Sequence, residues 1–257
     1  MNLIFLKKKV RSVFLKWIYS KVNFSFYVGS HNKAYYLAFG LKHEQLLFAP
    51  HAVDNDRFMN HDEALNEQAS LKRKELGIAT GALVFLFAGK LDDNKNVQLL
   101  LHAFMDLNNA AIHLIIAGNG VTELALRSIA AGKKNIHFLP FQNQQYMPVL
   151  YRIGNVLVLP SLTETWGLSI NEAMACSRTI LISDTCGAAT DLVKEGKNGY
   201  TFSSGNRASL LQRMQQILAQ QEEMGDWGSC SLEIIKDWNY SVTCETIEAA
   251  VKKNGSH

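Results

Sequence analysis

Short apolar runs alternate with amphipathic stretches between residues 82 and 204, and this alternation limits the possible folds more than any other feature of the sequence. The runs cover residues 82–89, 111–118, 135–141, 155–161, 178–184 and 199–204. They are too short and too continuously apolar for exposed helices, and they are typical of buried parallel strands. The stretches between them read as helices, which predicts βαβ units with right-handed crossovers. We therefore predict an α/β fold with a doubly wound, Rossmann-like parallel sheet.

The two ends of the chain do not share this alternation. A basic helix is expected first, followed by a strand at 24–30, a helix at 33–40 and a short strand at 45–50. After residue 205 the sequence predicts helices to the end of the chain. The parallel sheet should therefore carry extra N- and C-terminal helices.

Composition narrows the classes of protein. Hydrophobic residues make up 47% and charged residues 19% of the 257 residues, which is typical of a globular protein. The net charge of +3 is too small to indicate a nucleic-acid partner. The four cysteines have the spacing of neither a CxxC pair nor a zinc site, so we expect no metal and a reduced, cytoplasmic protein.

Two lysines follow the first apolar run. Gly89 and Lys90 precede a turn, and Lys95 stands where the next helix should begin. A glycine turn, a helix N-terminus and two ammonium groups suit a diphosphate. The alternative is that both lysines are solvated surface residues. After the second run, Gly118-Asn119-Gly120 lacks the third glycine of a dinucleotide fingerprint and fits a plain strand-to-helix turn better.

The fourth run leads into a loop and a helix that each carry a carboxylate. Glu164 lies in the loop, Glu172 lies on the second turn of the helix, and the backbone N–H groups of Trp166, Gly167 and Leu168 lie between them. Carboxylates accept hydrogen bonds from sugar hydroxyls, and N–H groups donate to phosphate. We predict that one crevice holds both ends of a sugar nucleotide. Alternatively, Glu164 caps the helix and Glu172 is solvated.

These motifs together resemble those of family 4 retaining glycosyltransferases of GT-B fold. The resemblance covers about residues 45–250, and its most specific part is the Glu-x7-Glu spacing of Glu164 and Glu172 followed by Ala-Met-Ala. It implies that the sheet is the C-terminal domain of a GT-B enzyme. Residues 48–58 resemble the crossing between the two domains, with His51-Ala52 in place of the usual Asn-Gly.

The resemblance also implies roles for single residues. Glu164 would be the catalytic-site carboxylate that contacts hydroxyls of the transferred sugar, and Glu172 would hold the nucleotide ribose. Lys95 would bind the diphosphate, with Lys90 in place of a usual arginine and Asn96 in place of a usual glycine. The remaining donor-binding positions would be Gly118, Phe141, Trp166, Gly167 and Leu168.

The chain is short for such an enzyme. The resemblance divides it into residues 1–55, a remnant of the acceptor domain with the crossing, residues 56–240, the nucleotide-sugar domain, and residues 241–257, a crossover helix and tail. It implies that most of the acceptor domain is missing, together with the surface on which the C-terminal helix would dock.

The expected activity is transfer of a hexose, with retention, from a UDP- or GDP-sugar to a saccharide or lipid-linked acceptor, in the synthesis of cell-surface polysaccharide or lipopolysaccharide. The donor is a substrate, and no metal or other cofactor is expected because lysines serve the phosphates and no Asp-x-Asp motif stands in the crevice. The alternative is a sugar-nucleotide-binding module or subunit that is inactive without a partner domain. A dehydrogenase is disfavoured because no GxGxxG follows the first run.

Residues 3–21 should form a basic amphipathic helix. Apolar residues from Leu3, Ile4 and Leu6 to Trp17 and Ile18 fall largely on one stripe, and lysines and Arg11 occupy the rest. Such a helix suits the anionic inner face of a membrane. It equally suits a dimer contact or the core of the missing domain.

Overall fold

The computed structural model describes residues 3–59 and 63–254, with side chains described from residue 9 to residue 252. The chain divides into two compact units, which are described separately. One contains residues 53–237, and the other combines residues 1–52 with residues 238–257. Among the described residues, no helix is both long enough and apolar enough to cross a bilayer.

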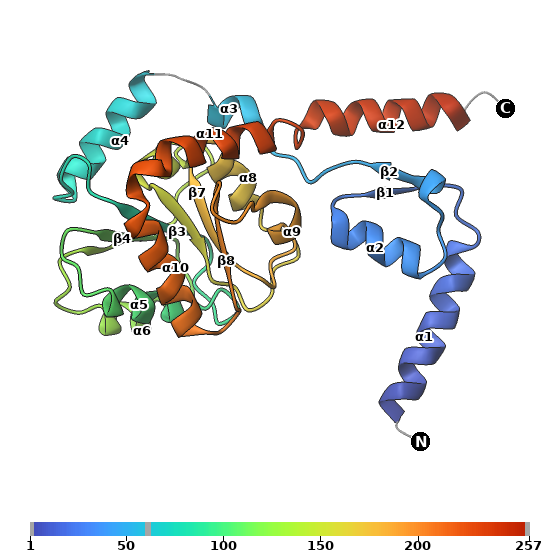
Figure 1. Ribbon diagram of the computed structural model, residues 1–257, viewed down its shortest axis with the longest axis horizontal. Coiled ribbons are helices and arrows are strands. Elements are labelled where there is room, and N and C mark those ends of the chain that lie inside the picture. Colours follow the sequence, from blue (N-terminus) through green and yellow to red (C-terminus); the bar gives the residue numbers. More distant parts are fainter. Residues whose placement is uncertain (1–2, 60–62, 255–257) are drawn as a thin grey trace. The chain divides into compact units, whose positions relative to one another are not determined.

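The larger unit is built on one six-stranded sheet, which confirms the predicted α/β fold (Figure 1). Every strand falls within one of the six apolar runs, and every pairing is parallel. The strand order is β5-β4-β3-β6-β7-β8. The strands are β3 (Val84–Ala88), β4 (His113–Ala117), β5 (Ile136–Leu139), β6 (Val156–Leu159), β7 (Thr179–Ser183) and β8 (Gly199–Phe202).

The strands are continuously apolar because helices cover both faces of the sheet. Phe85 and Phe87 of β3 point to opposite faces from Leu86, yet all three are at most 1% exposed. One set of helices in mutual contact is α5 (Val97–Asp106), α6 (Glu123–Ile129) and α10 (Arg207–Ala219). The other is α3 (Asn55–Met59), α4 (Glu63–Glu75), α7 (Met147–Ile153), α8 (Leu168–Ala175), α9 (Ala189–Leu192) and α11 (Met224–Ile235).

The smaller unit joins the two ends of the chain. Strands β1 (Ser25–Tyr27) and β2 (Leu46–Phe48) pair in parallel, with α2 (Ser30–Ala38) against β1 and α12 (Tyr240–Asn254) against β2. The hydroxyl of Thr243 donates to Pro50 O at 3.2 Å. Within this unit, α12 therefore packs against the short strand β2. The helix α1 (Leu3–Tyr19) opens this unit.

Candidate donor-binding site

The strand order reverses between β3 and β6, which lie side by side at the centre of the sheet. In open parallel sheets, ligands bind beyond the carboxyl ends of the strands at this switch point. A cavity of about 410 Å³ opens there, beyond the ends of β3, β4 and β5. Its lining residues are Ala88, Gly89, Lys90, Ala117, Gly118, Asn119, Phe141, Gln142, Gln144, Met147, Leu150, Tyr151, Ser169 and Glu172.

Four of the predicted donor-binding residues line this cavity. Glu172 enters from α8, while Lys90, Gly118 and Phe141 come from loops that follow three different strands. Phe141 is 67% exposed, so its ring is available to a ligand. The cavity therefore combines a carboxylate, a cation and an aromatic face, which are the groups that a ribose, a phosphate and a base require.

Glu172 is held by a buried tyrosine. The Tyr151 hydroxyl donates to Glu172 Oε2 at 2.6 Å, and the Tyr151 side chain is fully buried on α7. Burial raises the pKa of Glu172, while the hydrogen bond from Tyr151 and the charge of Arg57 oppose that rise. Burial, with the negative charge of Glu172, raises the pKa of Tyr151 well above its ordinary value. Tyr151 therefore stays protonated and orients the carboxylate.

Glu164 and Lys95 form a separate pair. Lys95 Nζ bonds to Glu164 Oε2, and the two side chains are only 23% and 15% exposed. Neither residue lines the cavity that contains Glu172. In the structure, the charge of Lys95 therefore holds Glu164 outside the cavity that Glu172 lines. The alternative that Glu164 caps the helix is wrong, since Gly167 occupies the N-cap of α8.

Asn94 positions the loop that carries Glu164. Its amide group donates to Thr163 O at 2.8 Å and accepts from the Thr163 hydroxyl at 2.8 Å and from its backbone N–H at 3.2 Å. Leu162 N also donates to Asn94 O at 2.8 Å. The loop after β3 and the loop after β6 thus form one hydrogen-bonded unit, and this unit brings Lys95 to Glu164.

Of the three residues at the start of α8, Trp166 and Gly167 are packed against neighbouring side chains, whereas Leu168 is exposed. The Trp166 indole is buried and donates to Asn171 Oδ1 at 2.9 Å. Gly167 has a φ of 93°, and a Cβ there would lie 2.9 Å from a Leu159 side-chain carbon. Leu168 is 46% exposed. The first N–H groups of a helix lack intrahelical partners, so this terminus can receive an anion.

The backbone conformations at Asn96 and Gly118 explain why these residue types occur there. Asn96 has a φ of 49°, a left-handed conformation that glycine adopts without strain and asparagine tolerates. Asn96 therefore occupies a turn conformation that glycine would also suit. A Cβ at Gly118 would lie 1.9 Å from Gly89 O, so the loops after β3 and β4 approach each other as closely as only glycine allows.

Sequence reasoning missed four residues of this region. Tyr151 and Asn94 act on the predicted residues as described, Ser169 lines the cavity, and the charge of Arg57 acts on Glu172. Tyr151 lies within an apolar stretch and looked like a core residue. Arg57 lies far from Glu172 in sequence, on α3, and only the contact between α3 and α8 brings it near.

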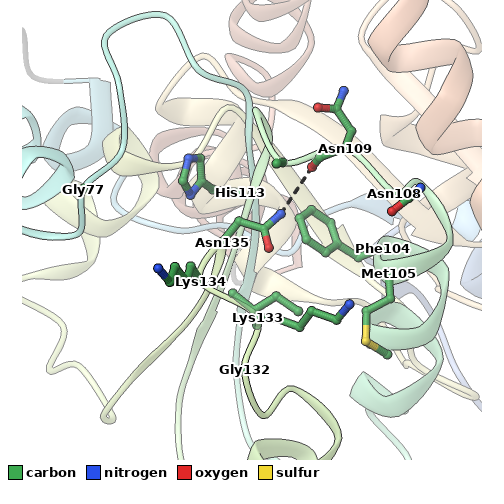
Figure 2. A pocket seen from close by; sticks show the side chains of 12 residues that line it. Gly77, Phe104, Met105, Asn108, Asn109, His113, Gly132, Lys133, Lys134 and Asn135 are labelled. Atoms are coloured by element: carbon green, nitrogen blue, oxygen red, sulfur yellow. Dashed lines mark hydrogen bonds between the residues drawn. The ribbon is translucent and has the colours of Figure 1, made fainter.

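A second hollow lies at the opposite edge of the sheet. Figure 2 shows Lys133, Lys134, Asn109 and Asn135 around it, near His113. The Asn135 amide donates to Asn109 O at 3.3 Å. His113 begins β4, so this hollow lies at an amino end, away from the ends at which such sheets bind their ligands.

The sequence profile of the family described as "Glycosyl transferases group 1" matches residues 68–231, which is more than half of the chain. The chain belongs to this family. Residues 68–231 include Lys90, Lys95, Glu164 and Glu172, so every charged residue predicted for the candidate site lies within the family region.

Two curated relatives are similar to this group 1 chain over most of its length. The D-inositol 3-phosphate glycosyltransferase of Geodermatophilus obscurus is 28% identical over 198 residues, covering 72% of this chain and 42% of the relative. The alpha-monoglucosyldiacylglycerol synthase of Acholeplasma laidlawii is 26% identical over 218 residues, covering 80% and 53%. The chain thus spans about half the length of these relatives.

A solved structure shares the fold. Anabaena HepE, solved in complex with UDP and glucose, superposes with a TM-score of 0.73 at 16% identity, covering 93% of this chain and 67% of that one. The predicted relation to GT-B glycosyltransferases is therefore confirmed at the level of the family and the fold.

Proposed function

We propose that this chain is the nucleotide-sugar-binding part of a retaining, family 4 glycosyltransferase that transfers a hexose. The carrying observation is the cavity at the switch point, where Glu172, Lys90 and Phe141 come together within the family region. Glu172 accepts from the ribose hydroxyls, Phe141 lies against the base, and Lys90 with Lys95 holds the diphosphate. Glu164 contacts the transferred sugar.

Donor binding rearranges one ion pair. Lys95 bonds to Glu164 in the structure, and both are proposed to contact the donor. The diphosphate takes over Lys95 as its counter-ion, which releases Glu164 toward the sugar hydroxyls. In the free protein, Lys95 and Glu164 therefore neutralise each other's charge until the donor binds.

A uridine donor is favoured over a guanosine donor. HepE, which shares the fold, binds UDP and glucose. No metal takes part in the proposal, since the two lysines and the α8 N-terminus supply the positive charge near the phosphates. The acceptor is proposed to be a saccharide or a lipid-linked saccharide of the cell surface.

The helix α1 is proposed to rest on an anionic membrane surface at the inner face of the cell membrane. Val10, Val13, Phe14 and Trp17 form one exposed stripe and are each at least 56% exposed. Lys9, Arg11 and Lys16 are exposed beside it, which complements anionic lipid. The apolar side chains expected at Leu3, Ile4 and Leu6 lie outside the described side chains. A homodimer through the same stripe is the outcome that would contradict this proposal.

Binding and turnover test the proposal separately. Calorimetry with UDP, GDP, UDP-glucose and GDP-mannose measures donor binding, and release of UDP or GDP from the sugar nucleotide measures catalysis. Binding with hydrolysis or transfer supports the enzyme. Binding without any turnover supports the second candidate, a sugar-nucleotide-binding subunit that needs a partner domain. Failure of every nucleotide to bind would refute both.

A further inference from the structure

A cavity of about 690 Å³ lies beside α4 at the amino edge of the larger unit's sheet. Its cationic lining consists of Arg73, Lys74, Arg152 and Arg178. Arg178 directly precedes β7, and the loop at 77–81 that also lines the cavity leads toward β3. The cavity is therefore separate from the candidate donor site, which lies at the carboxyl ends of the strands.

The arginines have a structural role that uses part of their hydrogen-bonding capacity. Arg178 donates to Gly154 O at 3.1 Å and to Cys176 O at 2.6 Å, and Arg73 donates to Ile153 O at 3.0 Å. These carbonyls close the C-terminal ends of α7 and α8. Cations are favoured at helix C-termini, so local structure explains why arginines stand here.

The helix-capping hydrogen bonds do not use every N–H donor of Arg73 and Arg178, and they do not neutralise the positive charge of either side chain. Within the described part of the chain, Arg178 Nη2 and Arg73 Nε make no hydrogen bond, and neither arginine has a carboxylate partner. No Asp or Glu occurs among the described residues that line the cavity. Burial lowers the pKa of Arg178, Cys176 opposes this shift, and repulsion from Arg152 and Arg73 lowers the pKa further. An arginine cannot shed its proton in a protein, so this repulsion persists until an anion relieves it.

We propose that this cavity binds the phosphate group of a small phosphorylated metabolite. Guanidinium forks match the oxygens of a phosphate in pairs, and the combined charge of Arg73, Lys74 and Arg178 suits a dianion better than a single carboxylate. The volume exceeds what a lone ion needs, and Asn66, Ser70 and Thr80 add polar groups that suit the hydroxyl-bearing remainder of such a molecule.

Ser70 offers a substitution that leaves every arginine contact in place. It is exposed, lines the cavity, and lies one helical turn before Arg73 and Lys74. Ser70→Glu places a carboxylate where the phosphate would bind, and Ser70→Gln is the neutral control of similar size. Lys74→Gln removes an exposed cation of the lining without touching a helix cap.

The experiment follows the melting temperature of the full chain with inorganic phosphate and pyrophosphate, against sodium chloride at equal ionic strength. Lys95→Gln serves as the background in which binding at the donor site is weakened. In this background, phosphate at ten times its dissociation constant should raise the melting temperature by about 3–5 °C. Ser70→Glu should weaken phosphate binding at least about tenfold and Lys74→Gln several-fold, while Ser70→Gln should leave it unchanged.

Two outcomes would overturn the proposal. One is a wild-type chain in which phosphate and chloride have the same effect. The other is a phosphate effect that survives Ser70→Glu and disappears with Lys95→Gln, which would place all anion binding at the donor site. Both outcomes are compatible with a nucleotide bound near Glu172, so this test can fail while the proposed function stands.

Discussion

Replacing Glu172 with glutamine should separate donor binding from stability. The glutamine amide keeps an oxygen that can accept from the Tyr151 hydroxyl, now 2.6 Å from Glu172 Oε2, but the substitution removes the charge. Hydrogen bonds to an ionised group contribute about 1.5–3 kcal/mol, and those between neutral groups about 0.5–1.5 kcal/mol. The difference of about 1–2 kcal/mol predicts that Glu172→Gln weakens UDP binding about 5- to 30-fold.

The same substitution should not destabilise the free protein. Burial raises the pKa of Glu172, which means that the fold disfavours the ionised carboxylate. Between the unfolded and the folded pKa, the folded state binds more protons, so this group lowers stability as pH rises through that window. At neutral pH, Glu172→Gln should therefore melt at or above the wild-type temperature in the absence of ligand.

Calorimetry with UDP and a thermal melt without ligand measure the two effects. Glu172→Ala is the companion variant, and it should lose about 1.5–3 kcal/mol of binding free energy, or about 10- to 150-fold in affinity. Wild-type UDP affinity in a folded Glu172→Gln protein would refute the ribose assignment. A large drop in its melting temperature would refute the argument that burial disfavours the charge.

The remaining predictions concern pH, backbone approach, metal and membrane. UDP binding should weaken as pH falls through the raised pKa of Glu172. Tyr151→Phe should move that loss of binding to higher pH, because the hydrogen bond from Tyr151 lowers the pKa of Glu172. The same pH profile for both proteins in calorimetry would contradict this. Gly118→Ala should prevent stable folding, since its Cβ would lie 1.9 Å from the carbonyl oxygen of Gly89. The control Gly132→Ala has open space and should lower the free energy of unfolding by only about 1 kcal/mol, because of its positive φ. Denaturant titration measures both effects. UDP-sugar binding should persist in EDTA; binding that needs added manganese would exclude the metal-free proposal. Trp17→Ser should weaken co-sedimentation of the protein with vesicles that contain phosphatidylserine. A dimer that forms regardless of salt concentration, in a protein that does not bind these vesicles, would indicate self-association instead.

Local patterns in the sequence were enough to predict the sheet. The central strands β3, β6 and β7 are buried along their whole length, as expected for parallel strands covered by helices on both faces. The shortness and continuous apolar character of the six runs therefore indicated β3 to β8. The loop-and-helix placement of Glu164 and Glu172 was also readable, because the apolar run ending near Leu159 and the helical pattern from Leu168 bound the loop between them.

The partners of those residues depended on tertiary structure. Tyr151 reaches Glu172 because α7 and α8 pack together, and Asn94 fixes Thr163 because the loops after β3 and β6 meet at the switch point. Such contacts join residues that are 21 and 69 positions apart, and no local pattern encodes them. The sequence by itself determined which elements form and which charged residues follow the strands. Only the packing of those elements decided that Glu164 pairs with Lys95 and that Glu172 faces a cavity, because strand order and helix contacts bring distant side chains together.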